Sequence, residues 1–166
     1  MTPELQTYLK SKFPKLYTEC GRDNPFELFG FECQDGWFRP ILWLSKYLQS
    51  YIDQQNKSAE KYPEQYLPVK QIKVVQVKEK FGTLRFYVDG GNQHTQAVIS
   101  FVEYISGFVC ETTGQTENVG YNKKGWIKTQ HKSLANGKDF YVVDDPELQQ
   151  ILNNQTEFNF NSPLKK

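Results

Sequence analysis

The segment 77–87 concentrates basic and aromatic side chains, and it reads Val-Lys-Glu-Lys-Phe-Gly-Thr-Leu-Arg-Phe-Tyr. Four of its side chains are expected to share one surface of an extended hairpin, because strand residues alternate between faces. These four are Lys78, Lys80, Arg85 and Tyr87. Arginine beside aromatic rings binds phosphate through paired hydrogen bonds and stacks on planar bases. The segment therefore indicates a binding surface for an anionic, nucleotide-like ligand. The alternative is a hairpin whose basic side chains only cover its aromatic rings.

Five further residues supply rings and cations to the predicted ligand-binding surface. They are Trp37, Arg39, Phe81, Trp126 and Lys128. Charge is segregated along the chain: residues 69–88 carry five basic side chains and one acidic, and residues 121–138 carry five lysines and no acid. Two such segments lying side by side attract anions. The alternative is that these lysines only occupy solvent-facing positions of strands and prevent pairing at the sheet edges.

No residue pattern indicates a catalytic centre. A nucleophilic cysteine needs a lowered pKa and a nearby base, whereas Cys33 stands between Glu32 and Asp35, whose charges disfavour a thiolate. These two carboxyl groups are candidates for acid–base work, but Asp35 equally suits a turn before Gly36. The sequence predicts no catalytic residue and no cofactor, and a hydrolase using Glu32 or Asp35 stays as an alternative.

A remnant of a zinc site is visible in the second half of the chain. Cys110-x-x-Thr113-Gly114 and the segment that ends at His131 have the outline of a zinc ribbon. A structural zinc needs four ligands, and only Cys110 and His131 are available here. The sequence therefore predicts that no metal is bound.

The elements that must position these residues predict an α+β fold. Helices are expected from Thr2 to Phe13 and from Trp37 to about residue 58, where Trp37, Ile41, Leu44 and Leu48 form an apolar stripe. Residues 18–36 are expected to form an ordered loop. Alternating β-branched residues over 69–88, with Gly82 between them, predict a β-hairpin. Further predictions are a helix over 92–106 ending at Gly107, strands over 126–129 and 140–143, a helix over 145–152 and a flexible tail at 153–166. Residues 1–152 are expected to form a single domain.

Length and composition exclude several classes of protein. The chain has 166 residues, 15% of them aromatic, which argues against disorder. A net charge of +1 argues against bulk nucleic-acid binding. No apolar run approaches the length of a membrane span, and the first residues lack the pattern of a signal peptide. With three widely spaced cysteines, Cys20, Cys33 and Cys110, we expect a cytoplasmic protein.

Three blocks of the sequence resemble a family of small uncharacterised proteins of phages, prophages and bacteria. The first is the acidic-Cys-x-Asp-Gly-Trp block at 31–38, and the second is the hairpin string at 77–87. The third joins the Cys-Glu-x-x-Gly segment at 110–114 with the Gly-Trp-x-Lys-Thr segment at 125–129. The resemblance implies an accessory protein of a mobile element, located in the host cytoplasm if phage-encoded, and it transfers no activity.

Together these observations predict a non-catalytic binding protein. Its expected ligand is an anionic molecule of nucleotide type, which a phage protein would sequester as a counter-defence. The alternative is an immunity or inhibitor protein that binds a toxin or an enzyme, for which aromatic residues with a charged rim are also suited. A homo-oligomer is compatible with either function, and no membrane partner is expected.

Overall fold

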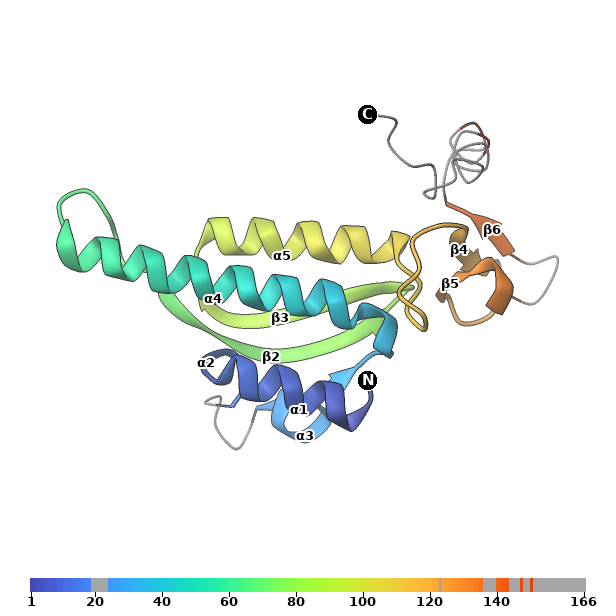
Figure 1. Ribbon diagram of the computed structural model, residues 1–166, viewed down its shortest axis with the longest axis horizontal. Helices are drawn as coiled ribbons and strands as arrows, with labels where there is room; N and C mark the ends of the chain where they lie inside the picture. Colours follow the sequence, from blue (N-terminus) through green and yellow to red (C-terminus); the bar gives the residue numbers. More distant parts are fainter. Residues whose placement is uncertain (19–23, 123, 136–139, 144–146, 148–149, 151–166) are drawn as a thin grey trace, which may run out of the picture.

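The computed structural model shows an α+β protein, as the sequence predicts, and it describes residues 1–18, 24–122, 124–135, 140–143, 147 and 150. Two three-stranded sheets are present among these residues, in the orders β1-β2-β3 and β5-β4-β6. The first sheet is covered by helices, and the second lies beyond the closed end of its hairpin (Figure 1). Most of the predicted helix at 145–152 and all of the tail at 153–166 lie outside the described residues.

The predicted hairpin forms the centre of the first sheet. β2 (Lys70–Lys80) and β3 (Thr83–Gly91) are antiparallel, and Lys78 pairs with Arg85. The two-residue turn between them has φ of 54° at Phe81 and 78° at Gly82. Positive φ at both central residues gives the turn a twist that matches the flanking strands. The turn thereby fixes the register and the face on which each strand residue lies.

The two faces of this hairpin differ in burial. Directly opposed residues point to the same side of a sheet. Val77 and Phe86 form one such pair and are buried, whereas Lys78 and Arg85 form the next pair and are half-buried. Tyr87 pairs with Gln76 on the same side as Lys78 and is exposed. The predicted common surface of Lys78, Lys80, Arg85 and Tyr87 is therefore confirmed by the register.

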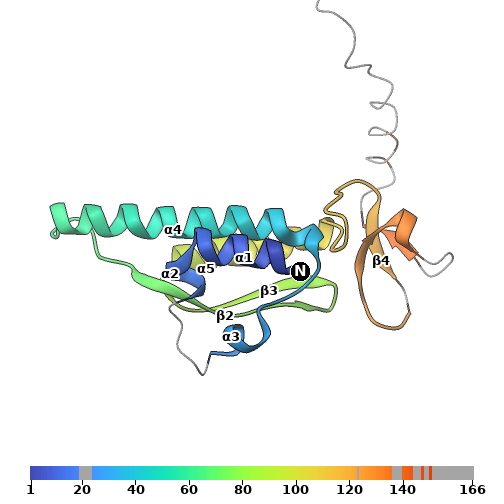
Figure 2. The same cartoon turned by 60° about the horizontal axis from the view of Figure 1, so that its bottom comes forward.

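Helices cover the buried face (Figures 1 and 2). They are α1 (Pro3–Lys12), α2 (Pro14–Tyr17), α4 (Phe38–Lys61) and α5 (Gln93–Ile105). Tyr17 shows how they are joined: its ring contacts Phe31 and Phe86, and its hydroxyl lies 2.5 Å from that of Ser45 on α4. The amphipathic pattern of α4 places Ile41, Leu44, Leu48 and Ile52 in the core, because these residues recur at helical spacing.

Residues 24–37 contain more structure than the predicted loop. They form the short helix α3 (Pro25–Phe29), strand β1 (Phe31–Glu32), which runs parallel to β2, and the 3-10 turn η1 (Asp35–Trp37). The side chain of Asn24 accepts from the N–H of Phe26 and thereby caps α3. The predicted C-cap at Gly107 is wrong: α5 continues into the 3-10 turn η2 (Ser106–Phe108), and Gly107 has no positive φ.

The second sheet differs in part from the predicted strands. It consists of β4 (Val119–Asn122), β5 (Thr129–His131) and β6 (Phe140–Val142). The 3-10 turn η3 (Lys132–Leu134) directly follows β5. The predicted strand at 126–129 is a loop up to Lys128. The strand predicted at 140–143 is present as β6. β4 was not predicted, because its Gly120 and Asn122 are residues that strands disfavour.

Side chains occupy the hydrogen-bonding groups at both edges of the first sheet. On β3 the N–H of Leu84 donates to Ser106 Oγ at 2.8 Å, and the N–H of Phe86 donates to Glu103 Oε1 at 2.8 Å. Beyond β1, Asn24 Nδ2 donates to the carbonyl of Val74 on β2 at 2.7 Å.

In the part of the chain described above, no helix combines the length and the apolar character that a membrane span requires.

Candidate functional site

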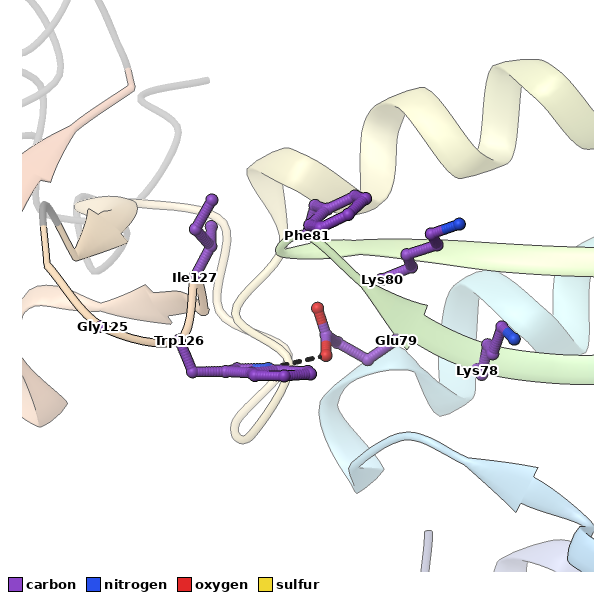
Figure 3. A pocket seen from close by; sticks show the side chains of 7 residues that line it. All are labelled: Lys78, Glu79, Lys80, Phe81, Gly125, Trp126 and Ile127. Carbon is purple, nitrogen blue, oxygen red and sulfur yellow. Dashed lines mark hydrogen bonds between the residues drawn. The ribbon is translucent and has the colours of Figure 1, made fainter.

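A pocket of about 490 Å³ lies between the turn of the β2–β3 hairpin and the loop that precedes β5 (Figure 3). It is called the hairpin-tip pocket below. Its lining residues are Lys78, Glu79, Lys80, Phe81, Gly125, Trp126 and Ile127. Four of the nine predicted ligand-binding residues line it: Lys78, Lys80, Phe81 and Trp126. The structure thus brings together the two basic segments, 69–88 and 121–138, which are separated by residues 89–120 in the sequence.

Glu79 links the two walls of the pocket. Its Oε1 accepts from the N–H of Gly82 at 2.7 Å, and its Oε2 accepts from Nε1 of Trp126 at 2.9 Å, the bond drawn in Figure 3. One carboxylate therefore holds both the hairpin turn and the indole ring. Glu79 is not evident from the sequence, because an acid within a basic segment gives no signal of a partner 47 residues away.

The loop that carries Trp126 is organised by Asn122 at the end of β4. Its Nδ2 donates to the carbonyls of Lys124 and Trp126, each at 2.6 Å, and its Oδ1 accepts from the N–H of Lys128 at 2.7 Å. These three bonds close the loop on itself, as Asn side chains commonly do in turns. Trp126 is therefore held at its backbone by Asn122 and at its ring by Glu79, although the ring is 71% exposed.

Strand β5 is attached to the hairpin turn, and the segment before β4 is attached to the 3-10 turn η1. The hydroxyl of Thr129 donates to the carbonyl of Gly82. The N–H of Gly36 donates to the carbonyl of Glu111 at 2.7 Å, and a Cβ at Gly36 would lie 2.1 Å from the carbonyl oxygen of Cys110. Glycine is thus required at this position of the Asp-Gly-Trp block. These contacts fix the distance across the pocket.

The cations beside the pocket are partly engaged by their own strand neighbours. Lys78 Nζ lies 5.6 Å from the centre of the Tyr87 ring, and Lys80 Nζ lies 5.4 Å from the centre of the Phe81 ring. A guanidinium nitrogen of Arg85 donates to Thr83 Oγ1 at 2.6 Å and to the carbonyl of Leu84 at 2.7 Å. These two bonds show that Arg85 supports the hairpin. Its side chain leaves β3 on the same face of the sheet as Lys78.

Three predicted residues lie elsewhere. Trp37 is not on the surface: its ring is fully buried and donates to the carbonyl of Val109 at 2.9 Å, so its assignment to the ligand-binding surface is wrong. Its helical spacing with Ile41 explains this burial. Arg39 is exposed on the first turn of α4 and does not line the hairpin-tip pocket. Lys128 is exposed and lines a neighbouring hollow of about 430 Å³, with Trp126 as a shared wall.

The residues considered for catalysis have structural partners. Glu32 Oε2 accepts from Gln76 Nε2 at 2.9 Å, and Asp35 Oδ1 accepts from the N–H of Thr2 at 2.7 Å. Burial raises the pKa of the Cys33 thiol to about 12, with the charges of Glu111 and Asp35 adding to the effect. A thiol in this environment stays protonated near neutral pH and is a poor nucleophile.

The segment with the outline of a zinc ribbon is held by hydrogen bonds within the protein. The N–H of Thr113 donates to Cys110 Sγ at 3.4 Å, and the N–H of Gly114 donates to the carbonyl of Cys110 at 2.8 Å. His131 Nδ1 accepts from the N–H of Ser133 at 3.1 Å. Within the described ranges, no group of three or more His, Cys, Asp or Glu side chains is placed to hold a metal ion. Protein hydrogen bonds thus stabilise this segment.

Glu111 lies inside the same remnant and is 6% exposed. Its Oε1 accepts from the N–H of Gln34 at 3.1 Å. Burial raises the pKa of its carboxyl group, the hydrogen bond from Gln34 opposes that shift, and the charge of Glu79 adds to it. Glu111 therefore couples the segment after β1 to the C-terminal half of the protein, at some cost from burying its charge.

Comparison of the chain with protein-family models, with curated proteins and with solved structures found no match in any of the three. The resemblance to small phage and bacterial proteins therefore remains a prediction from the motifs.

Proposed function

We propose that this protein is a non-catalytic binding protein that takes an anionic ligand with a planar ring, of nucleotide type, in the hairpin-tip pocket. The observation that carries the proposal is the pocket itself, which brings the rings of Phe81 and Trp126 together with the cations Lys78 and Lys80. The two rings are 67% and 71% exposed, so they gain little from packing within the protein. Exposed rings beside cations in one concave site suit a planar anionic ligand.

Phe81 and Trp126 stand on opposite walls of the pocket as its two rings (Figure 3). Stacking of a base on an aromatic side chain contributes about 1–3 kcal/mol. The volume of about 490 Å³ falls within the roughly 300–1,000 Å³ that small-molecule sites occupy. Because Glu79 and Asn122 hold Trp126 in place, little ordering of that ring is needed when a ligand binds.

Cations line the same pocket and extend along the open face of the hairpin. Lys78 and Lys80 are lining residues, and Arg85 pairs with Lys78 across the two strands. Phosphate oxygens are the anions that suit such a row, since each cation contributes a charged hydrogen bond. The only acid among the lining residues is Glu79, both of whose oxygens already accept hydrogen bonds. The described lining residues include no Ser, Thr, Cys or His side chain, so we propose sequestration and not cleavage. A mobile-element protein that captures a host signal fits this chemistry.

Isothermal titration tests the proposal with three probes that separate ring from charge: ATP, adenosine and inorganic triphosphate. We expect ATP to bind more tightly than either fragment. Trp126→Ala should abolish the contribution of the Trp126 ring to the affinity for ATP. Trp43→Ala is the matched control, because Trp43 is 61% exposed but lies on α4 outside the pocket. No binding of ATP or of either fragment, or equal loss in both variants, would contradict the proposal.

The second candidate function is recognition of a protein target. Phe81 and Trp126 are exposed by 67% and 71%, and Lys78 and Lys80 stand beside them. Exposed aromatic anchors with a charged rim are typical of energetically dominant interface residues. Under this second function, Phe81→Ala and Trp126→Ala should abolish capture of the target by the purified chain. ATP and its fragments should then neither bind nor compete with the target.

A further inference from the structure

A second hollow, of about 430 Å³, lies beside the hairpin-tip pocket, and Trp126 lines both. Its other described lining residues belong to the β5-β4-β6 sheet and its loops, from Asn122 on β4 to Phe140 on β6. It is nearly as large as the hairpin-tip pocket, whose volume is about 490 Å³, and both fall within the range of small-molecule sites. The proposed function uses only the hairpin-tip pocket, so the second hollow requires an explanation.

The two hollows are lined by the same kinds of side chain. Each has two aromatic rings, one branched aliphatic side chain and two lysines. In the hairpin-tip pocket these are Phe81, Trp126, Ile127, Lys78 and Lys80, and in the second hollow they are Phe140, Trp126, Leu134, Lys124 and Lys128. Among the described residues that line the second hollow, none is Asp or Glu. The second hollow therefore suits a planar ring that carries phosphate, by the same chemistry as the first.

The segment that carries Trp126 is the partition between the two hollows. Gly125 and Ile127 line the hairpin-tip pocket, whereas Lys124 and Lys128 line the second hollow. The hydrogen bonds described above hold the backbone of this segment and the indole nitrogen in place. The ring, drawn in Figure 3, is 71% exposed and lines both hollows. One fixed ring can therefore contact a planar group in each hollow.

We infer, resting on the proposed function, that the ligand is a dinucleotide, whose two phosphate-linked nucleotide units occupy the two hollows on either side of Trp126. A longer phosphate chain on a single nucleotide is the simpler occupant of the second hollow. It would leave the apolar side chains there unused, since Leu134 is 44% exposed and Phe140 is half-buried. Two linked units use the rings and lysines of both hollows. Binding of the first unit also raises the effective concentration of the second.

Isothermal titration of the full chain with AMP, ATP and the 5′-phosphorylated adenosine dinucleotide pApA tests the inference. Adenine serves as the base because stacking on aromatic side chains tolerates any base. We expect one pApA per chain, bound at least about 100-fold more tightly than AMP, and also more tightly than ATP, although ATP carries the larger negative charge. Lys124→Ala and Lys128→Ala should each weaken pApA binding about 10-fold or more, and ATP binding less than about 3-fold. Lys132→Ala is the matched control, because Lys132 is exposed on η3 but does not line the second hollow.

The outcomes separate this inference from the proposed function. Tight binding of pApA that both lysine variants weaken, and that Lys132→Ala leaves unchanged, supports the dinucleotide. If ATP binds but pApA binds no more tightly, or if both variants keep full affinity for pApA, the inference is overturned and the proposed function stands. If none of the three probes binds, both are overturned. An affinity for a tetranucleotide more than about 10-fold above that for pApA would assign the surface to single-stranded nucleic acid and overturn the dinucleotide.

Discussion

Removing the Glu79 carboxylate should separate the two walls of the hairpin-tip pocket. Glu79→Ala deletes a charged acceptor for the N–H of Gly82 and another for the indole of Trp126. A hydrogen bond to a charged group contributes about 1.5–3 kcal/mol where it is partly buried, as at Gly82, and exposed bonds contribute less. We therefore expect the free energy of unfolding to fall by about 1.5–3 kcal/mol. For a chain of this length the melting temperature should drop by roughly 3–12 °C.

A double-mutant cycle isolates the bond to Trp126. Trp126→Phe keeps a ring but removes Nε1, so alone it should cost no more than about 1 kcal/mol. Combined with Glu79→Ala it should show a coupling free energy of about 0.5–1 kcal/mol, measured by urea unfolding of all four proteins. Glu117→Ala, which removes an exposed acid outside the pocket, is the control. A melting temperature of Glu79→Ala within about 1 °C of wild type would refute the reasoning.

The remaining four predictions concern Arg85, Gly36, Glu111 and the pair Cys110 and His131. Arg85→Ala should lower affinity for ATP about 10- to 150-fold by titration, and Arg85→Lys should not restore it, because an ammonium lacks the bidentate fork; a lower melting temperature with unchanged affinity would assign Arg85 to the hairpin alone. Gly36→Ala should lower the melting temperature strongly or prevent folding, since its Cβ would lie 2.1 Å from the carbonyl oxygen of Cys110. Glu111→Gln keeps an acceptor for Gln34 and removes a buried charge. The pKa of Glu111 is raised above 4.5 in the fold, so its ionisation destabilises the protein as pH rises. The melting temperature of the variant should therefore exceed that of wild type by an amount that grows from pH 4.5 to neutrality. A difference that does not change with pH would show that the carboxyl group is well solvated. Chelator should leave the melting temperature unchanged and metal analysis should find no stoichiometric zinc, because Cys110 and His131 are already engaged by backbone N–H groups; one equivalent of zinc would contradict this.

The hairpin was predictable because its signals are local. Alternation fixes which side chains share a face, and Gly82 marks the turn, so the surface that contains Lys78 and Arg85 follows from the sequence. Trp37 was misassigned although its helical spacing with Ile41 and Leu44 already placed it on a buried stripe. Both Trp37 and Arg39 were expected near the hairpin surface for their residue types, whereas Trp37 is buried and Arg39 is exposed.

The supporting residues of the site were not predictable for a different reason. Glu79 and Glu111 accept hydrogen bonds from Trp126 and Gln34, which only the tertiary fold brings near them. Asn122 holds the backbone of the loop that follows it, and its residue type alone does not distinguish it from other asparagines of the chain. Periodicity carries no information about such bonds. The parallel pairing of β1 with β2 was also not predictable, because a strand of two residues is too short to show a pattern.

The hydrogen bonds that Ser106 and Glu103 make along β3 bear on how this aromatic-rich chain stays in solution. An edge strand with free N–H groups accepts strands from other molecules, which is a route to cross-β aggregation. At Leu84 and Phe86 those groups already donate to Ser106 of η2 and to Glu103 of α5. Further copies of the chain therefore cannot add there by strand extension while α5 is docked. Local release of α5 would open that edge, so the onset of aggregation on heating should follow the undocking of this helix and not the melting of the whole core.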